Sequence, residues 1–203
     1  MNRQSLEEKE LKLKLRLAQL ERNEACQNNF LQFVRRLWPE FITGRHHEII
    51  AEKLERVAKG ELKRLIINMA PRHTKSEFAS FLFPAWMMGR KPNMKIIQAT
   101  HTTELAVNFG RKTKNMIDSD EYKEIFPEVK LAADSKASGR WDTSAGGMYY
   151  AVGVGSNLAG RGGDLVIIDD PHSEQTAMSN NGFDDAWEWY TGGPRQRLQP
   201  GGS

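Results

Sequence analysis

The sequence predicts an α/β fold, with a mostly parallel sheet flanked by helices and an additional helical region at the N-terminus. Two observations predict this class. Beyond Gly60, short apolar runs alternate with longer amphipathic stretches, which is typical of parallel strands joined by helical crossovers. Before Gly60, apolar residues recur at helical spacing among many charged ones. We therefore expect an N-terminal helical region, residues 1–60, and an α/β core, residues 61–203.

A long charged helix is expected over Ser5–Leu37. Leu13, Leu17 and Leu20 recur at i, i+4 and i+7, and Glu and Lys are dense around them. The helix should end at Trp38, because the residue before a proline avoids helical backbone angles. Such a helix can pack on the core or reach a neighbouring molecule.

The remaining elements follow from the same patterns. A second helix is expected over His46–Lys59, where Gly60 stops it. The expected strands are Arg64–Met69, Met94–Thr100, Met148–Val154 and Asp164–Asp170. The expected helices of the core are Lys75–Met88, Thr103–Asp118 and Phe183–Tyr190. Glycines in WDTSAGGMYYAVG favour a hairpin around the third strand.

The composition is that of a globular protein of a reducing compartment. Of 203 residues, 39% are hydrophobic and 27% charged, which allows a sizeable core. No run of about 18 apolar residues occurs, and the N-terminus is too polar for a signal peptide, so we expect no membrane span and no secretion. Cys26 is the single cysteine, which excludes an internal disulfide and a thiolate zinc cluster and suggests a packing residue.

Charge is unevenly distributed, although the net charge is only +3. Residues 162–194 contain acidic residues but no Lys or Arg, while basic residues gather elsewhere, as in residues 12–16 and 111–114. Clusters of this kind are usually solvated helix faces. The charge alone therefore does not indicate nucleic-acid binding.

A turn without glycine joins the first expected core strand to a helix, in LIINMAPRHTKSEF, residues 65–78. In a phosphate-binding P-loop, G-x-x-x-x-G-K-[ST], backbone N–H groups wrap the phosphates, the Lys reaches their oxygens and the Ser or Thr hydroxyl holds Mg²⁺. When the turn is aligned on Lys75 and Ser76, Met69 and Thr74 occupy the two glycine positions. The pattern alone leaves open a chance Lys–Ser pair.

A second segment, DLVIIDDP, residues 164–171, has the form of a buried strand that delivers two carboxylates to the edge of a sheet. In NTPases the first such acid takes Mg²⁺ through water and the next polarises the attacking water. Asp169 lies 94 residues after Lys75, which leaves room for a further strand between the two motifs. A strand that ends in a solvated Asp-Asp-Pro turn is the alternative.

Several segments, in order, resemble one known family. They are LIIN with PRHTKSE, FPAWMMGRKPNMKIIQATHT, NLAGRGGDLVIIDDPHS and DAWEWY. From about Phe30 to its end, the chain resembles the ATPase domain of tailed-bacteriophage terminase large subunits, the motors that pump viral DNA into capsids. The loop of that family often reads PPRHGKS, so Ala70 and Thr74 are departures from its pattern.

The resemblance implies a P-loop NTPase fold of the additional-strand type, with ATP and Mg²⁺ as cofactors. Lys75 would contact the β and γ phosphates, and Ser76 and Asp169 would bind the metal. The nucleotide-binding residues would be Pro71, Arg72, His73, Thr74, Lys75, Ser76 and Glu77.

The resemblance also implies three catalytic residues. Arg72 matches the loop arginine of the family that is thought to sense or stabilise the γ-phosphate. Asp170 stands where many relatives carry a catalytic Glu. Arg161, in GRGG, is a candidate arginine finger that acts on a neighbouring subunit, and a turn arginine that binds a carboxylate locally is the alternative.

The implied function is that of the packaging ATPase of a terminase large subunit, which couples ATP hydrolysis to movement of double-stranded DNA into a procapsid. Its partners would be viral DNA, the portal protein, the terminase small subunit and further copies of itself in a ring, in the host cytoplasm and without a membrane. The nuclease domain of the family is not expected in these residues. A helicase-like P-loop translocase is one alternative. A non-hydrolysing DNA-binding or scaffold module, which Thr74 and Asp170 would permit, is another.

The implied fold also has a consequence for the sheet. In P-loop ATPases of this type, the strand after the second motif inserts between the strands of the two motifs, and here it would start after Gly202. We therefore expect an incomplete sheet, with unpaired backbone groups along Arg64–Met69 and Asp164–Asp170. The 203 residues alone should then be marginally stable and nearly inactive as an ATPase.

Overall fold

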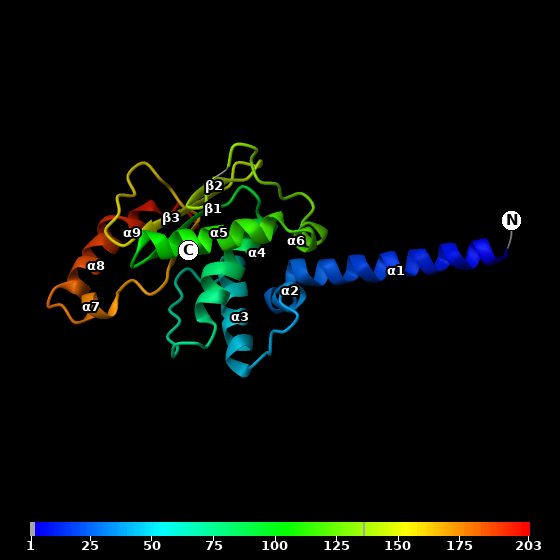
Figure 1. The fold of residues 1–203 in the computed structure, drawn as a ribbon, viewed down its shortest axis with the longest axis horizontal. Helices are drawn as coiled ribbons and strands as arrows, with labels where there is room; N and C mark the ends of the chain where they lie inside the picture. Colours follow the sequence, from blue (N-terminus) through cyan, green and yellow to red (C-terminus); the bar gives the residue numbers. More distant parts are fainter. Residues whose placement is uncertain (1–2, 136) are drawn as a thin grey trace.

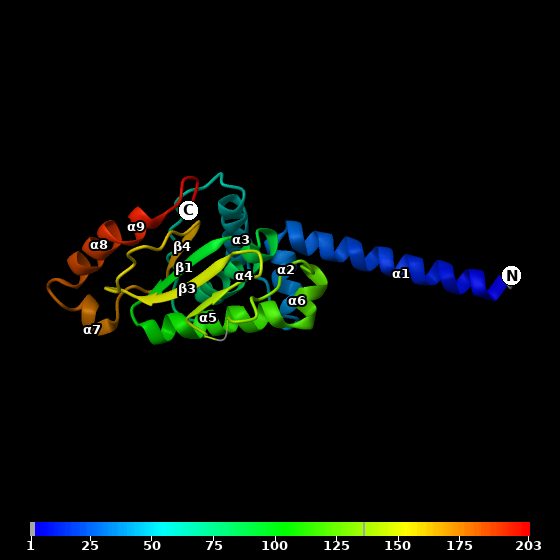
Figure 2. The ribbon, with the colours of Figure 1, turned by 90° about the horizontal axis from the view of Figure 1, so that it is seen from above.

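In the computed structural model, residues 3–135 and 137–203 are described, and they form an α/β body from which one long helix projects (Figure 1). The sheet in these residues has the order β2-β3-β1-β4 (Figure 2). Its strands are β1 (Lys95–Thr100), β2 (Arg140–Asp142), β3 (Met148–Gly153) and β4 (Leu165–Ile168). β1 pairs in parallel with β3 and β4, and β2 pairs antiparallel with β3. The α/β class, the mostly parallel sheet and the hairpin are confirmed.

β1 is the central strand of this sheet. Ile97 of β1 lies opposite Tyr150 of β3 and Val166 of β4. Five of its six residues are buried, as expected of a strand that is paired on both edges and covered on both faces. Because β1 and β4 run in parallel, their carboxyl ends meet at one edge of the sheet, where Asp169 and Asp170 follow β4.

α5 (Thr103–Asp118) covers the sheet along β1 and β3, with the bounds that the sequence predicts. Gly110 permits this close packing, because a Cβ there would lie 2.5 Å from the carbonyl oxygen of Ser138 and 3.0 Å from the Tyr149 ring. Tyr149 in turn stacks on Trp141 of β2, with ring centroids 5.0 Å apart. Both rings are fully buried, so this aromatic pair fixes the helix against the hairpin.

The N-terminal region forms α1 (Arg3–Asn28), α2 (Phe30–Leu37) and α3 (Arg45–Ala58). The prediction of one continuous helix over Ser5–Leu37 was wrong, because the helix is interrupted at Asn29. The backbone of Asn29 is extended, and its side chain accepts a hydrogen bond from the backbone N–H of Gln32. An asparagine that caps a helix in this way starts a new helix instead of continuing the old one.

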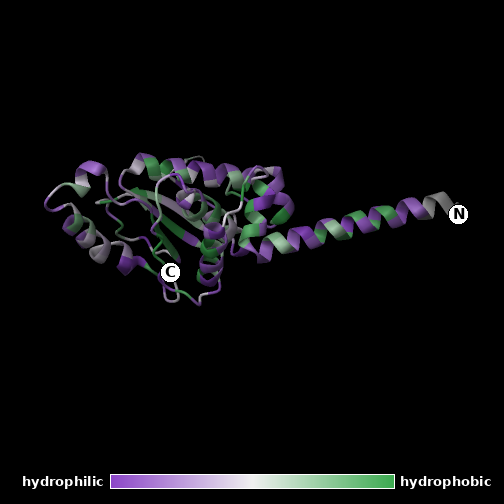
Figure 3. Cartoon of the chain, turned by 90° about the horizontal axis from the view of Figure 1, so that it is seen from below, coloured by the Kyte–Doolittle hydropathy of each residue, from purple (hydrophilic) through white to green (hydrophobic). Residues whose placement is uncertain are grey.

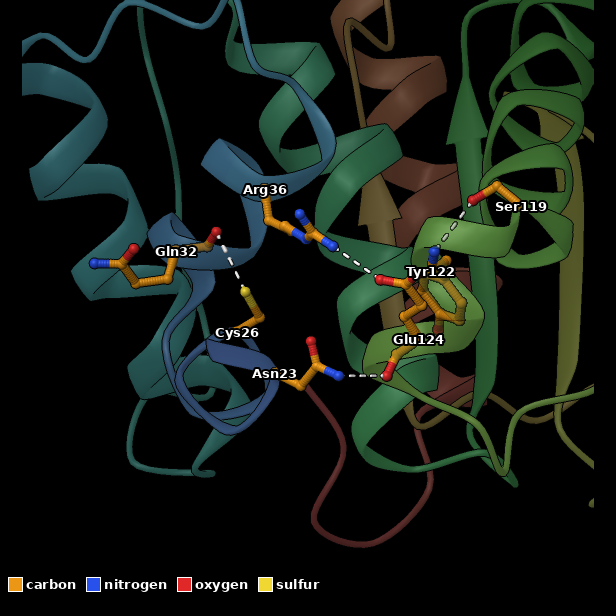
Figure 4. A network of polar contacts seen from close by, with 7 residues as sticks. All are labelled: Asn23, Cys26, Gln32, Arg36, Ser119, Tyr122 and Glu124. Atoms are coloured by element: carbon orange, nitrogen blue, oxygen red, sulfur yellow. Dashed lines mark hydrogen bonds and ion pairs between the residues drawn. The ribbon is translucent and has the colours of Figure 1, made fainter. Parts of the chain in front are cut away.

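The last turns of α1 anchor it to the body (Figure 4). Asn23 Nδ2 donates to the backbone oxygen of Glu124 at 2.7 Å, in the last turn of α6 (Asp120–Ile125). Arg36 of α2 forms an ion pair with the Glu124 carboxylate at 2.8 Å. Cys26 is buried, as predicted, and burial raises the pKa of its thiol. Further out, hydrophobic and hydrophilic residues are interleaved along the projecting part of α1 (Figure 3).

Three helices lie at the end of the molecule away from α1 (Figure 1). They are α7 (Glu174–Ala177), α8 (Gly182–Gly192) and α9 (Pro194–Arg197). The sequence predicted only α8, because α7 and α9 are single turns without enough residues to show a period. They follow the second motif and lead the chain back to β4, where Gly163 N–H donates to the carbonyl oxygen of Arg197 at 2.8 Å.

The expected strand Arg64–Met69 is not formed in the structure. Its side chains still alternate, with Ile66 85% exposed while Leu65 and Ile67 pack against the core, but its backbone has no ladder partner. A groove of about 770 Å³ lies between this segment and β4, and no strand of the described residues occupies it. The segment keeps an extended shape without becoming a strand, since a strand requires a hydrogen-bonded neighbour.

The C-terminal residues begin to line the β4 side of this groove. Ser203 N–H donates to the Asp164 carbonyl oxygen at 3.0 Å, and Val166 N–H donates to the Ser203 carbonyl oxygen at 2.9 Å. Two bonds from one residue to alternate residues of a neighbour are the pattern of a parallel bridge. The outer edge of β4 is therefore able to pair with a parallel strand.

Candidate functional site

The glycine-free turn lies at the mouth of the groove and leads into a helix. Helical structure begins at Lys75 and continues through the π-helical segment η1 (Glu77–Leu82) into α4 (Phe83–Arg90). Two turn residues, Arg72 with φ 65° and Thr74 with φ 61°, have left-handed backbones. Alternation of left-handed and right-handed residues turns successive N–H groups toward one point, which is how a backbone nest binds an anion. A π-helical turn directly after it is a feature often found at functional sites.

The two sequence motifs meet at this place. Lys75 Nζ lies 2.9 Å from Asp170 Oδ1, in an ion pair whose side chains are 22% and 57% exposed. Asp170 has φ 42°, which is unusual for a non-glycine residue. Its carbonyl oxygen accepts from the N–H of His101 at 3.2 Å, so the residue that follows β1 holds this backbone in place. The parallel register of β1 and β4 thus delivers Asp170 to the loop lysine.

Asp169 is held by a residue that the sequence did not single out. Ser80 Oγ, on η1, donates to Asp169 Oδ2 at 2.8 Å, and Ser80 is fully buried. Ser80 lies four residues after Ser76, but the segment that contains Ser80 is π-helical, and Ser76 is not among the residues that line the groove. The α-helical spacing rule therefore does not indicate Ser80 from the sequence. Asp169, Asp170, Lys75 and Ser80 all line the groove.

The other predicted loop residues lie around this centre. Pro71, Arg72 and His73 are exposed, and Pro71 supplies the carbonyl oxygen that His73 Nδ1 contacts at 2.9 Å. Glu77 points instead to α5, where its carboxylate pairs with Lys112 Nζ at 2.6 Å. The exposed guanidinium of Arg72 is therefore free of the core, while Glu77 is bound to the scaffold.

Arg161 is not brought to the carboxylates. Its guanidinium stacks on the Tyr150 ring of β3 at 3.6 Å, and β1 separates β3 from β4. Within the described residues, Arg161 forms no salt bridge and is not among the residues that line the groove. The local carboxylate partner that was the alternative for Arg161 is likewise not found there. A role on a neighbouring subunit stays a prediction.

The predicted metal ligands are few. In the part of the chain that the structure describes, no group of three or more His, Cys, Asp or Glu side chains could hold a metal ion. The two predicted ligands are a hydroxyl, Ser76, and a carboxylate, Asp169, of which Asp169 lines the groove and Ser76 does not. This donor set fits Mg²⁺ in a phosphate complex, where one or two protein oxygens, nucleotide phosphates and water complete the shell. It does not fit a zinc or calcium site made of protein ligands alone.

Comparison with known proteins does not identify a family for this chain. A scan against protein-family models found no match, and a search of curated proteins found none either. The helices of residues 3–135 and 137–203 include none that is long and apolar enough to cross a bilayer. The fold class therefore comes from the structure, and the family resemblance stays a prediction.

Proposed function

We propose that this chain is a P-loop NTPase of the additional-strand type that hydrolyses ATP with Mg²⁺. The single observation that carries the proposal is the ion pair of Lys75 with Asp170, at 2.9 Å. It joins a loop with two left-handed residues to the carboxylates at the end of a buried strand. Long-range ion pairs also occur in this chain without a ligand, as between Arg36 and Glu124. This pair supports a shared ligand because it joins the left-handed loop to the carboxylates at a strand end.

In the proposed mechanism each residue has a separate task. Backbone N–H groups of residues 72–76 and the Lys75 ammonium bind the phosphates, and Ser76 and Asp169 would hold the metal. Bound Mg²⁺ would neutralise charge on the phosphates. Lys75 turns from Asp170 to the phosphates when they arrive, because their larger negative charge attracts the ammonium group more strongly. Asp170 is then free to orient the attacking water, and Arg72 stabilises charge that develops on the γ-phosphate.

The proposed setting is viral DNA packaging. The order of matching segments supports a terminase large subunit, with double-stranded DNA, the portal protein, the small subunit and further copies of the chain in a ring on the procapsid as partners. Arg161 would act across the subunit boundary. A helicase-like translocase shares the same site chemistry, and stimulation by a portal-bound procapsid distinguishes the two.

The first experiment is ATP hydrolysis by the Lys75→Ala variant. Hydrolysis is expected to fall below detection, because the charge that binds the phosphates is removed. The thermal melt should stay close to that of the parent, because the partner Asp170 is 57% exposed and an ion pair with an exposed partner contributes little to stability. Lys123→Ala is the matched control, since Lys123 pairs with Asp118 on the surface at 2.7 Å. It removes the same charge and should leave hydrolysis unchanged. Equal loss in both variants would contradict the proposal.

A non-hydrolysing module is the second candidate, favoured by one observation. Thr74, with φ 61°, places a β-branched side chain where the loop requires a left-handed backbone. If the chain binds ATP tightly but releases no phosphate with Mg²⁺ and DNA, this second function replaces the first.

A further inference from the structure

His47 of α3 contacts the loop of residues 71–76 and is linked to it by a series of hydrogen bonds. Gly44 N–H donates to His47 Nδ1 at 2.9 Å. His47 Nδ1 therefore carries no proton, and the neutral ring has its proton on Nε2. His47 Nε2 lies 2.6 Å from Thr74 Oγ1, which itself donates to the His73 carbonyl oxygen at 2.7 Å. The chain has one consistent direction, from α3 into the loop.

The His47 ring is fixed by aromatic packing. It stands in the first turn of α3, is 6% exposed, and lies between Phe41, at a centroid distance of 4.7 Å, and Phe78, at 5.1 Å. Phe78 belongs to η1, directly after the loop. Burial lowers the pKa of His47, and the nearby His46 and His73 lower it further. The ring is thus rigid, neutral and able to donate one hydrogen bond in a fixed direction.

Thr74 is the residue that needs such support. Its backbone is left-handed, and a β-branched side chain makes that conformation costly, by about 1 to 3 kcal/mol in general. In the loop pattern that the chain resembles, glycine takes this place without strain. Thr74 keeps the conformation here while its hydroxyl is bound on both sides, by His47 and by its own preceding carbonyl group.

We propose that His47 is a positioning residue that clamps Thr74 in its left-handed conformation and so keeps the loop N–H groups aimed at a phosphate. This inference deepens the proposed function, on which it rests for the identity of the ligand. A residue of α3, outside both sequence motifs, thus maintains the left-handed backbone that a glycine adopts without strain in the usual P-loop. The clamp itself is a property of the chain without nucleotide.

Two variants separate the ring from its N–H group. His47→Phe keeps an aromatic ring between Phe41 and Phe78 but cannot donate, whereas His47→Gln can donate an amide N–H at a similar place. A third variant, Thr74→Gly, removes the strain and with it the need for the clamp. The double variant of His47→Phe with Thr74→Gly completes a mutant cycle, which measures the coupling of the two residues.

The main readout is amide hydrogen exchange of residues 72–76 in the full chain without nucleotide. In His47→Phe these amides should exchange about fivefold faster, as expected for loss of the hydrogen bond to Thr74, while amides of β1 keep their rates. The Gly44 amide also loses its acceptor in this variant, so faster exchange at Gly44 is expected and does not count against the clamp. His47→Gln should recover most of the protection. With Thr74→Gly as the parent, the same His47→Phe change should alter exchange by less than about twofold. The affinity of His47→Phe for ATP, measured by titration in the presence of Mg²⁺, should likewise be about fivefold weaker than that of the parent.

Two outcomes would overturn the clamp. One is faster exchange throughout β1 and α3, which would make His47 a general packing residue. The other is an equal effect of His47→Phe in both the threonine and glycine backgrounds. If the mutant cycle shows coupling but the parent binds no ATP, the clamp stands and the proposed function fails. If ATP is hydrolysed but no coupling is found, the reverse holds.

Discussion

Two extended apolar segments of this protein, β1 and residues 64–69, have similar sequences and different structures. KIIQAT forms the centre of the sheet, with a strand on each side and nearly every residue buried. RLIINM lies across the groove from β4, with alternate side chains exposed and no ladder. Apolar composition therefore specifies an extended chain, and the neighbours decide whether it becomes a strand.

The same comparison separates scaffold from chemistry. The β1 side carries the tightly packed pairs, such as Trp141 on Tyr149. The side of residues 64–76 carries the exposed segment, the left-handed loop residues and Lys75. Strained backbone at a site of this kind is maintained by the packed region next to it.

The largest effect is expected at the two carboxylates that end β4. Asp170→Asn should lower ATP hydrolysis by about a thousandfold with little change in nucleotide affinity, because it removes the group that orients water. Asp169→Asn should instead weaken binding of ATP with Mg²⁺, since the amide is a poor metal ligand. Steady-state kinetics and ATP titration measure the two effects. Weaker binding in Asp170→Asn alone would exchange the two roles.

A smaller effect, on stability, compares two isoleucines directly. Ile96 of β1 is fully buried, so Ile96→Ala should lower the free energy of unfolding by about 2 to 5 kcal/mol. Ile66 is 85% exposed, so Ile66→Ala should change it by less than about 0.5 kcal/mol. Urea denaturation measures both. A cost at Ile66 comparable to that at Ile96 would show that another chain segment covers the groove in solution.

The same contrast explains which helices and strands could be predicted from the sequence. Local signals predicted α5 to the residue and β1, β3 and β4 within a residue or two, because each has a clear period and a capping or turn residue at its ends. The break at Asn29 was missed, since a helix cap and a helix interior differ by one side-chain hydrogen bond. A strand at residues 64–69 was predicted and is not formed, whereas the expectation that this segment would lack a pairing partner is confirmed. The apolar run indicates an extended chain, but pairing is not a local property.

The candidate site could be predicted only in part for the same reason. Order and spacing indicated Lys75 and the carboxylates, and the structure brings Lys75 and Asp170 together. Ser80 and His47 were missed, because their contacts with Asp169 and Thr74 depend on how helices pack against the loop. Arg161 was predicted to serve the same reaction, yet it stacks on Tyr150 of β3. Three-dimensional neighbours of a motif are not encoded in its spacing.

The smallest predicted effect concerns pH and uses His47 as the reporter. The pKa of His47 is lowered in the folded chain, so the folded state binds fewer protons than the unfolded state near the ordinary value of 6.5. The stability from the neutral ring is then complete at pH above the ordinary value, and is lost as the pH falls below it toward the lowered folded pKa. The groups that face His47 are His46, at a centroid distance of 3.8 Å, and His73, and both lower the pKa of His47.

Urea denaturation of the parent between pH 7.5 and 5.5 should therefore show stability that declines with acid. The decline should be smaller in His47→Phe, which has no proton to gain. It should persist in Thr74→Gly, where the ring keeps its place between Phe41 and Phe78 although it loses the Thr74 hydroxyl. His46→Phe is the matched control for the neighbouring charge, since it keeps His47 and removes one repulsive partner. Identical pH slopes in the parent and in His47→Phe would mean that the His47 ring titrates alike in both states. The folded state would then not favour the neutral form of His47, which the hydrogen bond to Thr74 requires. The packing around β1 would be unaffected by that result.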